Sequence, residues 1–344
     1  MKENKLITFV VPCYNSQDYM EKCVDSLLKG GEKAEILIID DGSTDRTGEI
    51  ADRYERDHPG RVRALHQENG GHGEGINHGL REASGVYFKI VDSDDWLAAD
   101  ALQEVLDCLE SFEKEGGIDL CICNYVYDHQ GKKRRNQTIR YGNIFPQGEI
   151  FGWEQTKAFR PWQLLTLHSC IYRTEILRAC HMELPKHVFY EDNLFVYYPL
   201  PNVKKMYYLN ADLYHYFIGR EDQSVSETVI KKRCGDQILI TTKIFKSYHL
   251  EEIAKDNLKL AKYMYHEMVM MATIATAFTR LNNSKEADAQ VEEMWKDLES
   301  FDEKLAHKIK HASLAVFENI PGRVGRLFGM RCYRIAHRFV LNFN

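Results

Sequence analysis

The sequence predicts an α/β protein with a mainly parallel sheet flanked by helices, followed by a C-terminal helical extension. Three observations predict this fold. Short apolar runs alternate with helical periodicity in the first half of the chain, which is typical of strand–helix–strand units. Polar residues come directly after three of those runs, as they do where strands end at a ligand-binding crevice. Beyond about residue 225 the strand signals fade and helical periodicity continues alone.

The first elements are predicted by a change of period. Residues 7–11 form an apolar, β-branched run, as expected for a buried strand. Apolar side chains then recur at helical spacing over residues 20–28, and the pair Gly30-Gly31 ends that helix. A second apolar run at residues 35–39 predicts the next strand.

Two further strands complete the parallel part of the sheet. They are predicted at residues 62–66 and 86–91, with a helix at residues 76–83 between them. Asp92-Ser93-Asp94-Asp95, called the DSDD turn below, follows the last strand directly, and the next helix is predicted to begin near Leu97. Because parallel strands end at the same edge, the polar residues after these strands are expected to converge on one crevice.

The helical extension is predicted from residue 226 to the end of the chain at residue 344. Its last part, residues 322–344, carries five arginines and no acidic residue among apolar side chains. That pattern is typical of a helix lying on a membrane surface or binding a partner. A terminal helix that packs on the body and exposes its basic side to water fits the same pattern.

Composition narrows the class of protein. At 344 residues the chain is long enough for two domains, and its net charge of −6 argues against a nucleic-acid partner. No apolar stretch is long enough to span a bilayer, and the first residues lead into a strand rather than a signal peptide. The nine cysteines form no CxxC pair, so buried reduced thiols are favoured over a metal or disulfide role. We therefore expect a cytoplasmic protein.

The DSDD turn is the most informative part of the sequence. Three carboxylates at the end of a buried strand repel one another unless a cation or hydrogen-bond donors neutralise them. Hard cations such as Mg²⁺ and Mn²⁺ bind through one or two carboxylates together with substrate phosphates. A solvated acidic turn that caps the following helix is the simpler alternative for this turn taken alone.

Several stretches together resemble the family-2 glycosyltransferases with a GT-A fold. They occur in that family's order and spacing, and the resemblance covers roughly residues 6–226. The matching stretches are Val10-Val11-Pro12-Cys13-Tyr14-Asn15, Ile39-Asp40-Asp41-Gly42-Ser43-Thr44-Asp45, Asn69-Gly70-Gly71, Glu82-Ala83-Ser84-Gly85-Val86-Tyr87, Val91-Asp92-Ser93-Asp94-Asp95 and Tyr190-Glu191-Asp192-Asn193-Leu194-Phe195. The resemblance implies a glycosyltransferase domain at residues 1–225, with a donor half at 1–128 and an acceptor half at 129–225.

The resemblance implies a set of contacts to a nucleotide-sugar donor. Asp41 would accept a hydrogen bond from a uracil-type N–H, Asp92 would hold the ribose, and Asp94 would bind a divalent metal, Mg²⁺ or Mn²⁺, on the diphosphate. Asp95 would support the metal site or cap the next helix. The nucleotide-binding residues are predicted to be Pro12, Tyr14, Asn15, Asp41, Asn69, Asp92 and Ser93. For Asp40 and Asp41 the alternative role is helix capping.

The pair Glu191-Asp192 is the predicted catalytic centre. It lies between apolar and aromatic residues, a setting that raises the pKa of a carboxylate. By the resemblance, Asp192 takes the proton from the acceptor hydroxyl, and Glu191 positions the donor sugar or the acceptor. A single base without a carboxylate nucleophile implies direct displacement with inversion. The alternative is an acidic pair that stabilises the start of a helix.

Further contacts to donor, phosphate or acceptor rest on weaker matches. Gly71, His72 and Glu74 stand where many relatives have small residues and an arginine. The stretch is not a dinucleotide fingerprint, because Ile76 occupies the place of its last glycine. The other candidates, each with a core or loop role as the alternative, are Asp95, Trp162 for an acceptor sugar, and His215 and Arg220 for the phosphates.

The sequence thus predicts a metal-dependent inverting glycosyltransferase. It would move a sugar from a nucleotide sugar, most simply UDP-linked, to a saccharide or lipid-linked saccharide, as in surface polysaccharide synthesis. Contact with the inner membrane face would run through residues 322–344. An inactive GT-A-like scaffold and a nucleotidyltransferase are the alternatives. Intact acids argue against the scaffold, and the lack of a basic Gly-rich loop after the first strand argues against the nucleotidyltransferase.

Overall fold

The chain consists of two compact units that are described separately. The computed structural model describes residues 5–129, 136–218, 227–317 and 319. The first unit comprises residues 1–157 and 165–219, and the second comprises residues 158–164 and 220–344. The first unit is an α/β domain of the predicted class, and helices follow it along the chain. The predicted boundary at residue 225 falls outside the described residues, as does the basic tail at residues 322–344.

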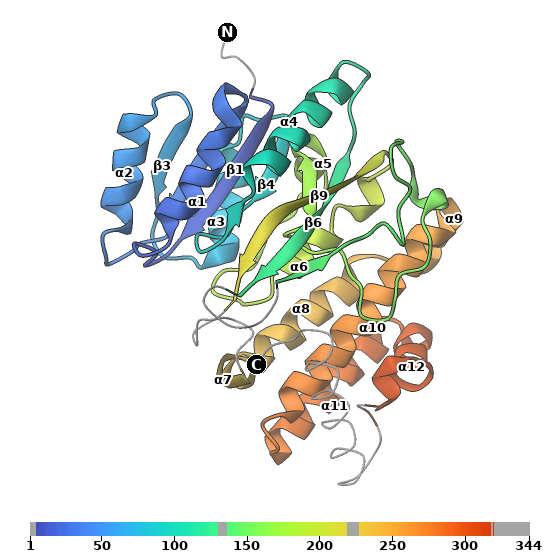
Figure 1. The fold of residues 1–344 in the computed structure, drawn as a ribbon. Coiled ribbons are helices and arrows are strands. Elements are labelled where there is room, and N and C mark those ends of the chain that lie inside the picture. Colours follow the sequence, from blue (N-terminus) through green and yellow to red (C-terminus); the bar gives the residue numbers. More distant parts are fainter. Residues whose placement is uncertain (1–4, 130–135, 219–226, 318, 320–344) are drawn as a thin grey trace. The chain divides into compact units, whose positions relative to one another are not determined.

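Four parallel strands form one half of the sheet. In spatial order they are β3 (Val62–His66), β2 (Ala34–Asp40), β1 (Ile7–Cys13) and β4 (Tyr87–Ile90). Every residue of β1 and β2 is buried, as expected for strands covered on both faces. The crossovers between these strands contain α1 (Met20–Leu27), the 3₁₀ segment Leu28–Lys33, α2 (Thr47–Asp57) and α3 (His72–Glu82). In Figure 1, β3 lies at the edge of this half beside α2.

The other half of the sheet is mixed. Beyond β4 the order continues with β8 (Cys170–Arg173), β6 (Leu120–Asp128), β9 (Met206–Phe217) and β5 (Trp96–Leu97), and β7 (Gln137–Ile139) pairs with β6. Only β6 and β9 are parallel here, since β4–β8, β8–β6, β6–β7 and β9–β5 are antiparallel. The remaining helical segments of this unit are α4 (Ala99–Glu113), α5 (Thr174–Ala179), α6 (Asp192–Tyr197) and the 3₁₀ turns Trp153–Gln155 and Leu200–Asn202.

Two helix starts differ from the prediction. The helix predicted from residue 76 begins at His72, so the glycine-rich stretch is its first turn rather than a loop. Its glycines permit close packing, because a Cβ atom at Gly79 would lie 2.4 Å from a methyl carbon of Val10 in β1. The helix predicted near Leu97 begins at Ala99 instead. Trp96 and Leu97 pair with β9 as strand β5, a long-range contact that local sequence does not reveal.

The second unit is helical in its described part. Its helices are α7 (Glu227–Lys232), α8 (Cys234–Ser247), α9 (Leu250–Asp256), α10 (Leu258–Arg280), α11 (Lys285–Phe301), α12 (Glu303–Ala312) and the 3₁₀ turn Leu314–Phe317. The long helix α10 packs against α8, α9 and α11. Among the described helices, none combines the length and the hydropathy needed to cross a bilayer.

Candidate active site

The loops after β1, β2 and β4 meet at the carboxyl edge of the parallel strands. The backbone N–H of Asn15 donates to Ser43 Oγ at 3.0 Å, and Asn15 Oδ1 accepts from the N–H of Thr44 at 2.9 Å. These bonds join the loop after β1 to the loop after β2. The hydroxyls of Ser16 and Ser93 lie 2.8 Å apart, which joins the loop after β1 to the DSDD turn. The polar strand ends therefore form one site.

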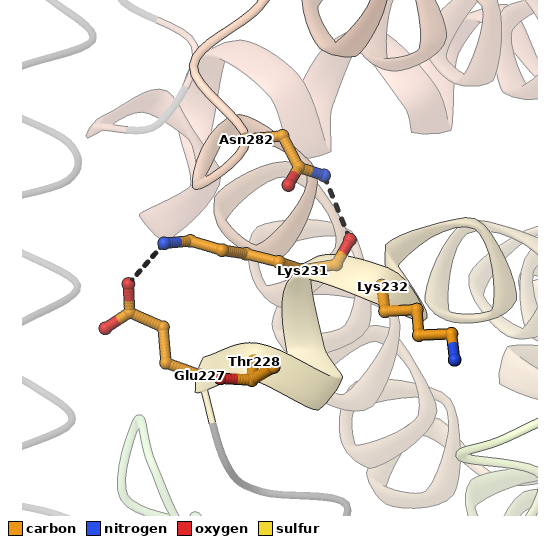
Figure 2. Close-up of a pocket in the computed structure, with 5 residues that line it drawn as sticks. All are labelled: Glu227, Thr228, Lys231, Lys232 and Asn282. Carbon is orange, nitrogen blue, oxygen red and sulfur yellow. Dashed lines mark hydrogen bonds and ion pairs between the residues drawn. The ribbon is translucent and has the colours of Figure 1, made fainter.

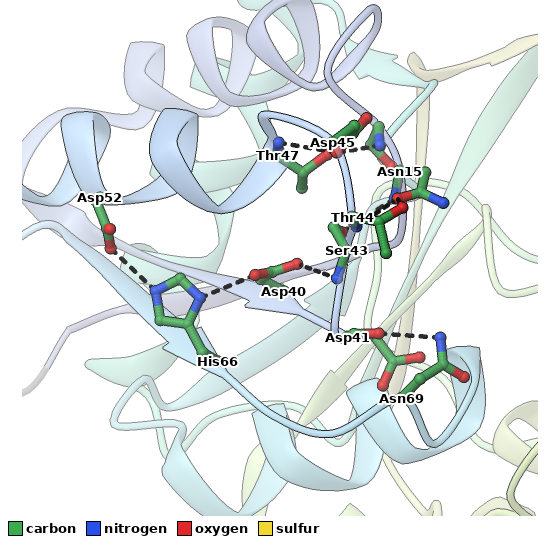
Figure 3. A network of polar contacts seen from close by, with 11 residues as sticks. Asn15, Asp40, Asp41, Ser43, Thr44, Asp45, Thr47, Asp52, His66 and Asn69 are labelled. Atoms are coloured by element: carbon green, nitrogen blue, oxygen red, sulfur yellow. Dashed lines mark hydrogen bonds and ion pairs between the residues drawn. The ribbon is translucent and has the colours of Figure 1, made fainter.

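A histidine between two carboxylates supports the loop after β2. His66 lies at the end of β3, and its ring nitrogens are 2.9 Å from Asp40 Oδ2 and 2.9 Å from Asp52 Oδ1. Figure 3 shows the ring between these two carboxylates. Hydrogen bonds to Asp40 and then to Asp52 raise the pKa of His66. The other oxygen of Asp40 accepts from the N–H of Ser43 at 3.1 Å. Asp40 therefore holds the loop in place.

Asp41 is held by hydrogen bonds from the segment that follows β3. Its Oδ1 accepts from Gln67 Nε2 and from the N–H of Gly70, both at 2.7 Å, and its Oδ2 accepts from the N–H of Gly71 at 2.8 Å. The side-chain amide of Asn69 donates to the carbonyl of Asp41 at 2.9 Å. Asp41 is only 3% exposed. Oδ1 thus accepts two hydrogen bonds and Oδ2 accepts one, so Oδ2 has the capacity to accept one more.

Tyr14 offers a flat surface beside these loops. It follows Cys13, whose strand partner is Asp40, and it is 54% exposed. Pro12 is buried against α3, where a Cβ atom at Gly75 would lie 3.1 Å from it. An exposed aromatic ring on a rigid strand end suits stacking against a base.

The DSDD turn is tied to β9 by its last residue. Asp95 is fully buried and accepts from the Tyr214 hydroxyl at 2.6 Å and from the N–H of Phe217 at 2.8 Å. The same hydroxyl accepts from the N–H of Asp92 at 3.1 Å. Burial and the charges of Asp94 and Asp92 raise the pKa of Asp95 well above its ordinary value. The turn thus concentrates negative charge on a rigid support.

Part of this turn has the donor set of a cation site. Ligand atoms of Asp92, Asp95 and His168 lie within 4.8 Å of one another, the one such group found among the described residues. Carboxylate oxygens and an imidazole nitrogen fit a divalent cation of the Mn²⁺ type. Asp94, the predicted ligand, is half-buried on the same turn but is not a member of this group.

His72 connects the DSDD turn to the Glu191-Asp192 pair. Its Nδ1 lies 2.6 Å from Glu191 Oε1, and its Nε2 lies 3.0 Å from Asp92 Oδ1. Burial lowers the pKa of His72, but the hydrogen bonds and charges of Asp92 and Glu191 outweigh it and hold that pKa well above its ordinary value. The two carboxylates therefore favour the protonated form of His72. In the structure it bridges two acids rather than standing open to a sugar.

Asp192 has the electrostatics of a general base. Burial and the charges of Glu191 and Asp92 raise its pKa to about 7, against the lowering effect of His72. The side-chain amide of Asn193 donates to Asp192 Oδ1 at 3.0 Å. A carboxylate whose pKa lies near the working pH accepts a proton effectively and releases it again.

Among the weaker candidates, several have other partners or lie elsewhere. Glu74 forms ion pairs with Arg81 at 3.0 Å and Lys186 at 3.9 Å. Trp162 belongs to the second unit and is 54% exposed, so its position relative to the acids is not described. Arg220 lies outside the described residues.

His215 is held in a stack on β9. Its ring lies 5.3 Å from the ring of Trp96, nearly parallel to it, and its Nδ1 lies 3.1 Å from Asp128 Oδ2. The ammonium of Lys22 covers the Trp96 ring at 2.8 Å from its centroid. His215 and the DSDD turn are thus joined through strand β5.

Two residues that sequence reasoning did not assign stand out in the structure. Lys89 in β4 is fully buried, and its Nζ donates to the carbonyl of His168 at 2.8 Å. Burial lowers the pKa of Lys89 to about 8 and the pKa of His168 to about 4. A lysine within the apolar run at residues 86–91 was the available signal for Lys89. The position of His168 depends on pairing between distant strands and left no local signal.

Two surface hollows do not coincide with these acids. One of about 580 Å³ lies in the second unit, lined by Glu227, Thr228, Lys231, Lys232 and Asn282 (Figure 2). Another of about 430 Å³ lies beside α3 and α5 in the first unit. Neither contains a predicted site residue, so the chemistry of the acids, rather than hollow size, locates the site.

Comparisons with known proteins identify the fold. The crystal structure of S. aureus TarS 1–349 in complex with UDP-GlcNAc is similar, with a TM-score of 0.64 and 21% sequence identity over 97% of this chain and 91% of that chain. At that identity the likeness concerns the fold, which is that of GT-A glycosyltransferases.

The sequence itself matches a family. The profile of Glycosyl transferase family 2 matches residues 8–178. Glycosyltransferase GlyA of Streptococcus pneumoniae is 29% identical over 221 residues, which are 62% of this chain but only 31% of GlyA. The uncharacterized glycosyltransferase EpsJ of Bacillus subtilis is 26% identical over 300 residues, 84% of this chain and 83% of EpsJ. The chain belongs to glycosyl transferase family 2, as its resemblance predicted.

Proposed function

We propose that the protein is a metal-dependent, inverting glycosyltransferase that uses a UDP-linked sugar. The observation that carries this proposal is the connected set of acids: Asp192, with a pKa near 7, lies beside Glu191, and His72 joins Glu191 to Asp92. Family membership gives the reaction class, and these acids give the residues that would perform it.

The donor would lie across the three loops at the sheet edge. Tyr14 would stack on the base, Pro12 and Asn15 would shape its wall, and the open position on Asp41 Oδ2 would accept the base N–H. Asn69, Gly71 and Glu74 would also line the donor. The bond networks that hold Asp41 and Asn15 make this surface rigid before the donor arrives, which lowers the entropy lost on binding.

The DSDD turn would receive the diphosphate. Asp92 and Ser93 would bind the ribose. Asp94 would bind the cation together with the phosphates, and Asp95 would support the turn. When bound, Mg²⁺ or Mn²⁺ supplies positive charge that stabilises the departing diphosphate. His215 and Arg220 would add positive charge or hydrogen bonds to the diphosphate.

Asp192 would remove the proton from the acceptor hydroxyl. Glu191 is 4% exposed, and its Oε1 lies 2.6 Å from His72 Nδ1, so it is poorly placed to attack carbon and would position the donor sugar or the acceptor instead. With one base and no carboxylate nucleophile, displacement at the anomeric carbon would invert its configuration.

The acceptor would be the hydroxyl of a saccharide or a lipid-linked saccharide, with Trp162 stacking on a sugar ring. We propose a cytoplasmic enzyme that contacts the inner membrane face through residues 322–344. A protein lacking residues 322–344 should no longer sediment with anionic vesicles, whereas the full chain should. Equal sedimentation of both proteins would exclude this contact.

Calorimetric titration tests the donor site. UDP should bind in the presence of Mn²⁺, and EDTA or Asp94→Ala should weaken binding at least about tenfold. The matched control is Asp100→Ala, which removes an exposed acid from the first turn of α4 and should leave the affinity unchanged. Equal affinity for UDP with Mn²⁺ and with EDTA would refute a metal-dependent site, and preference for another nucleoside diphosphate would correct the donor.

A further inference from the structure

His168 faces the DSDD turn from a different part of the chain. It precedes β8, and one of its ring nitrogens lies within 4.8 Å of a carboxylate oxygen of both Asp92 and Asp95. We propose that His168 supplies a nitrogen ligand to the divalent cation, so that the site is a mixed nitrogen and oxygen site that prefers Mn²⁺ to Mg²⁺. This inference rests on the proposed metal-dependent function and adds a ligand and a metal preference to it.

The first support is an unsatisfied atom. Nδ1 of His168 is buried and has no hydrogen-bond partner among the described residues. A buried polar atom without a partner is unfavourable, and native structures keep such atoms mainly where a ligand or function requires them. A cation bound at Nδ1 would give this atom the partner it lacks.

The second support is that the ring is held in place. It stacks on the ring of Tyr216 at 4.6 Å between centroids and meets the ring of Tyr214 edge-on at 4.8 Å. The buried ammonium of Lys89 donates to the carbonyl of His168 at 2.8 Å and to the carbonyl of Cys170 at 3.4 Å. Both the ring and its backbone are therefore fixed, as is usual for metal ligands held by surrounding residues.

Tyr214, which packs on the His168 ring, also orients Asp95. The ring of Tyr214 packs against His168, while its hydroxyl donates to Asp95 Oδ2 at 2.6 Å. One side chain thus fixes the position of His168 relative to the DSDD turn, although the two segments lie about seventy residues apart in the sequence. A histidine with only a packing role would not need a ring nitrogen within 4.8 Å of two carboxylates.

The chemistry of the donors gives the metal preference. Mg²⁺ binds almost entirely through oxygen, whereas imidazole nitrogen favours later first-row cations, and Mn²⁺ accepts both donors. Loss of the imidazole should therefore weaken Mn²⁺ binding more than Mg²⁺ binding.

Pulsed electron paramagnetic resonance of Mn²⁺ bound to the full chain with UDP tests the assignment. The wild-type spectrum should show modulation from a directly bound ¹⁴N nucleus, and growth on ¹⁵N-labelled histidine should convert that signal to ¹⁵N. His168→Gln should abolish it and weaken Mn²⁺ binding about tenfold or more, with a smaller effect on Mg²⁺. His181→Gln, which changes an exposed histidine outside the site, is the matched control and should retain the nitrogen signal.

The outcomes separate this inference from the proposed function. Mn²⁺ that binds with UDP but shows no histidine nitrogen would overturn the role of His168 and leave metal dependence intact. A signal that survives His168→Gln and disappears in His72→Gln would overturn it equally. Failure of Mn²⁺ to bind even with UDP would overturn both. The isotope-labelled wild-type spectrum decides the question even if His168→Gln does not fold.

Discussion

Replacing the proposed base should stabilise the protein in a pH-dependent way. Burial and neighbouring charges raise the pKa of Asp192 from 3.8 to about 7. A carboxyl group whose pKa is higher in the folded state binds protons more tightly there than in the unfolded chain. Its ionisation therefore favours unfolding, and stability is lost as the pH rises from about 4 to about 7. Asp192→Asn removes this ionisation and keeps an oxygen to accept from Asn193.

The size of the effect follows from the shift in pKa. About three pKa units correspond to an upper limit of about 4 kcal/mol above pH 7, reduced by the water that reaches this half-buried side chain. Asp192→Asn should thus exceed the wild type in stability at pH 8 and match it near pH 4, while losing at least about a hundredfold in turnover.

Urea unfolding at pH 4, 6 and 8, followed by circular dichroism, measures this directly. The exposed acid Asp100 provides the control, because Asp100→Asn should show no comparable gain at any pH. A stability difference between wild type and Asp192→Asn that is the same at pH 4 and pH 8 would refute the raised pKa, and with it the electrostatic basis for the catalytic role.

Three further predictions address catalysis, the loop support and helix packing. In the wild type, kcat/KM should rise with pH to a plateau, with an apparent pKa of about 7, and a profile that is flat from pH 5 to 9 would contradict this. Because the pKa of His66 is raised, its contribution is present below its unfolded pKa and lost as the pH rises through the folded value. His66→Gln should therefore lower stability by about 1 kcal/mol or less at pH 5.5 and by nearly nothing at pH 9, as measured by urea unfolding. Gly79→Ala should destabilise by about 1–3 kcal/mol, because its Cβ would meet Val10. Gly235→Ala, where nothing lies within 4 Å, should instead stabilise by about 0.4–1 kcal/mol; thermal unfolding compares the two, and equal effects would contradict the packing argument.

The sequence predicts the parallel half of the sheet well because its information is local. Nearly continuous apolar runs become β1 and β2, shorter ones that include Arg63 and Lys89 become β3 and β4, and turn residues mark the ends of these strands. The short strand β5 was missed, since two residues carry no periodicity and pair only with a distant strand. The early start of α3 was missed because glycine usually ends helices, whereas here the glycines allow close packing on β1.

The candidate site shows the same division between local and long-range information. The DSDD turn and the Glu191-Asp192 pair could be found as short stretches of the sequence. The bridge from His72 to Glu191 joins residues 119 positions apart, and the approach of His168 to Asp92 depends on the pairing of β8 with β4. Such contacts depend on tertiary structure, so residue types alone could not predict them.

The stereochemistry of sugar release tests whether the enzyme inverts the anomeric carbon with Asp192 as its base. The full chain is incubated with Mn²⁺ and UDP-linked α-sugars, beginning with UDP-GlcNAc, without an acceptor, so that water takes the place of the acceptor hydroxyl. Proton NMR then identifies the first anomer formed before it equilibrates. Inversion by a single base predicts that the β-anomer forms first and that its release is lost with EDTA and in Asp192→Asn. Formation of the α-anomer, or equal release by Asp192→Asn, would contradict inversion by a single base.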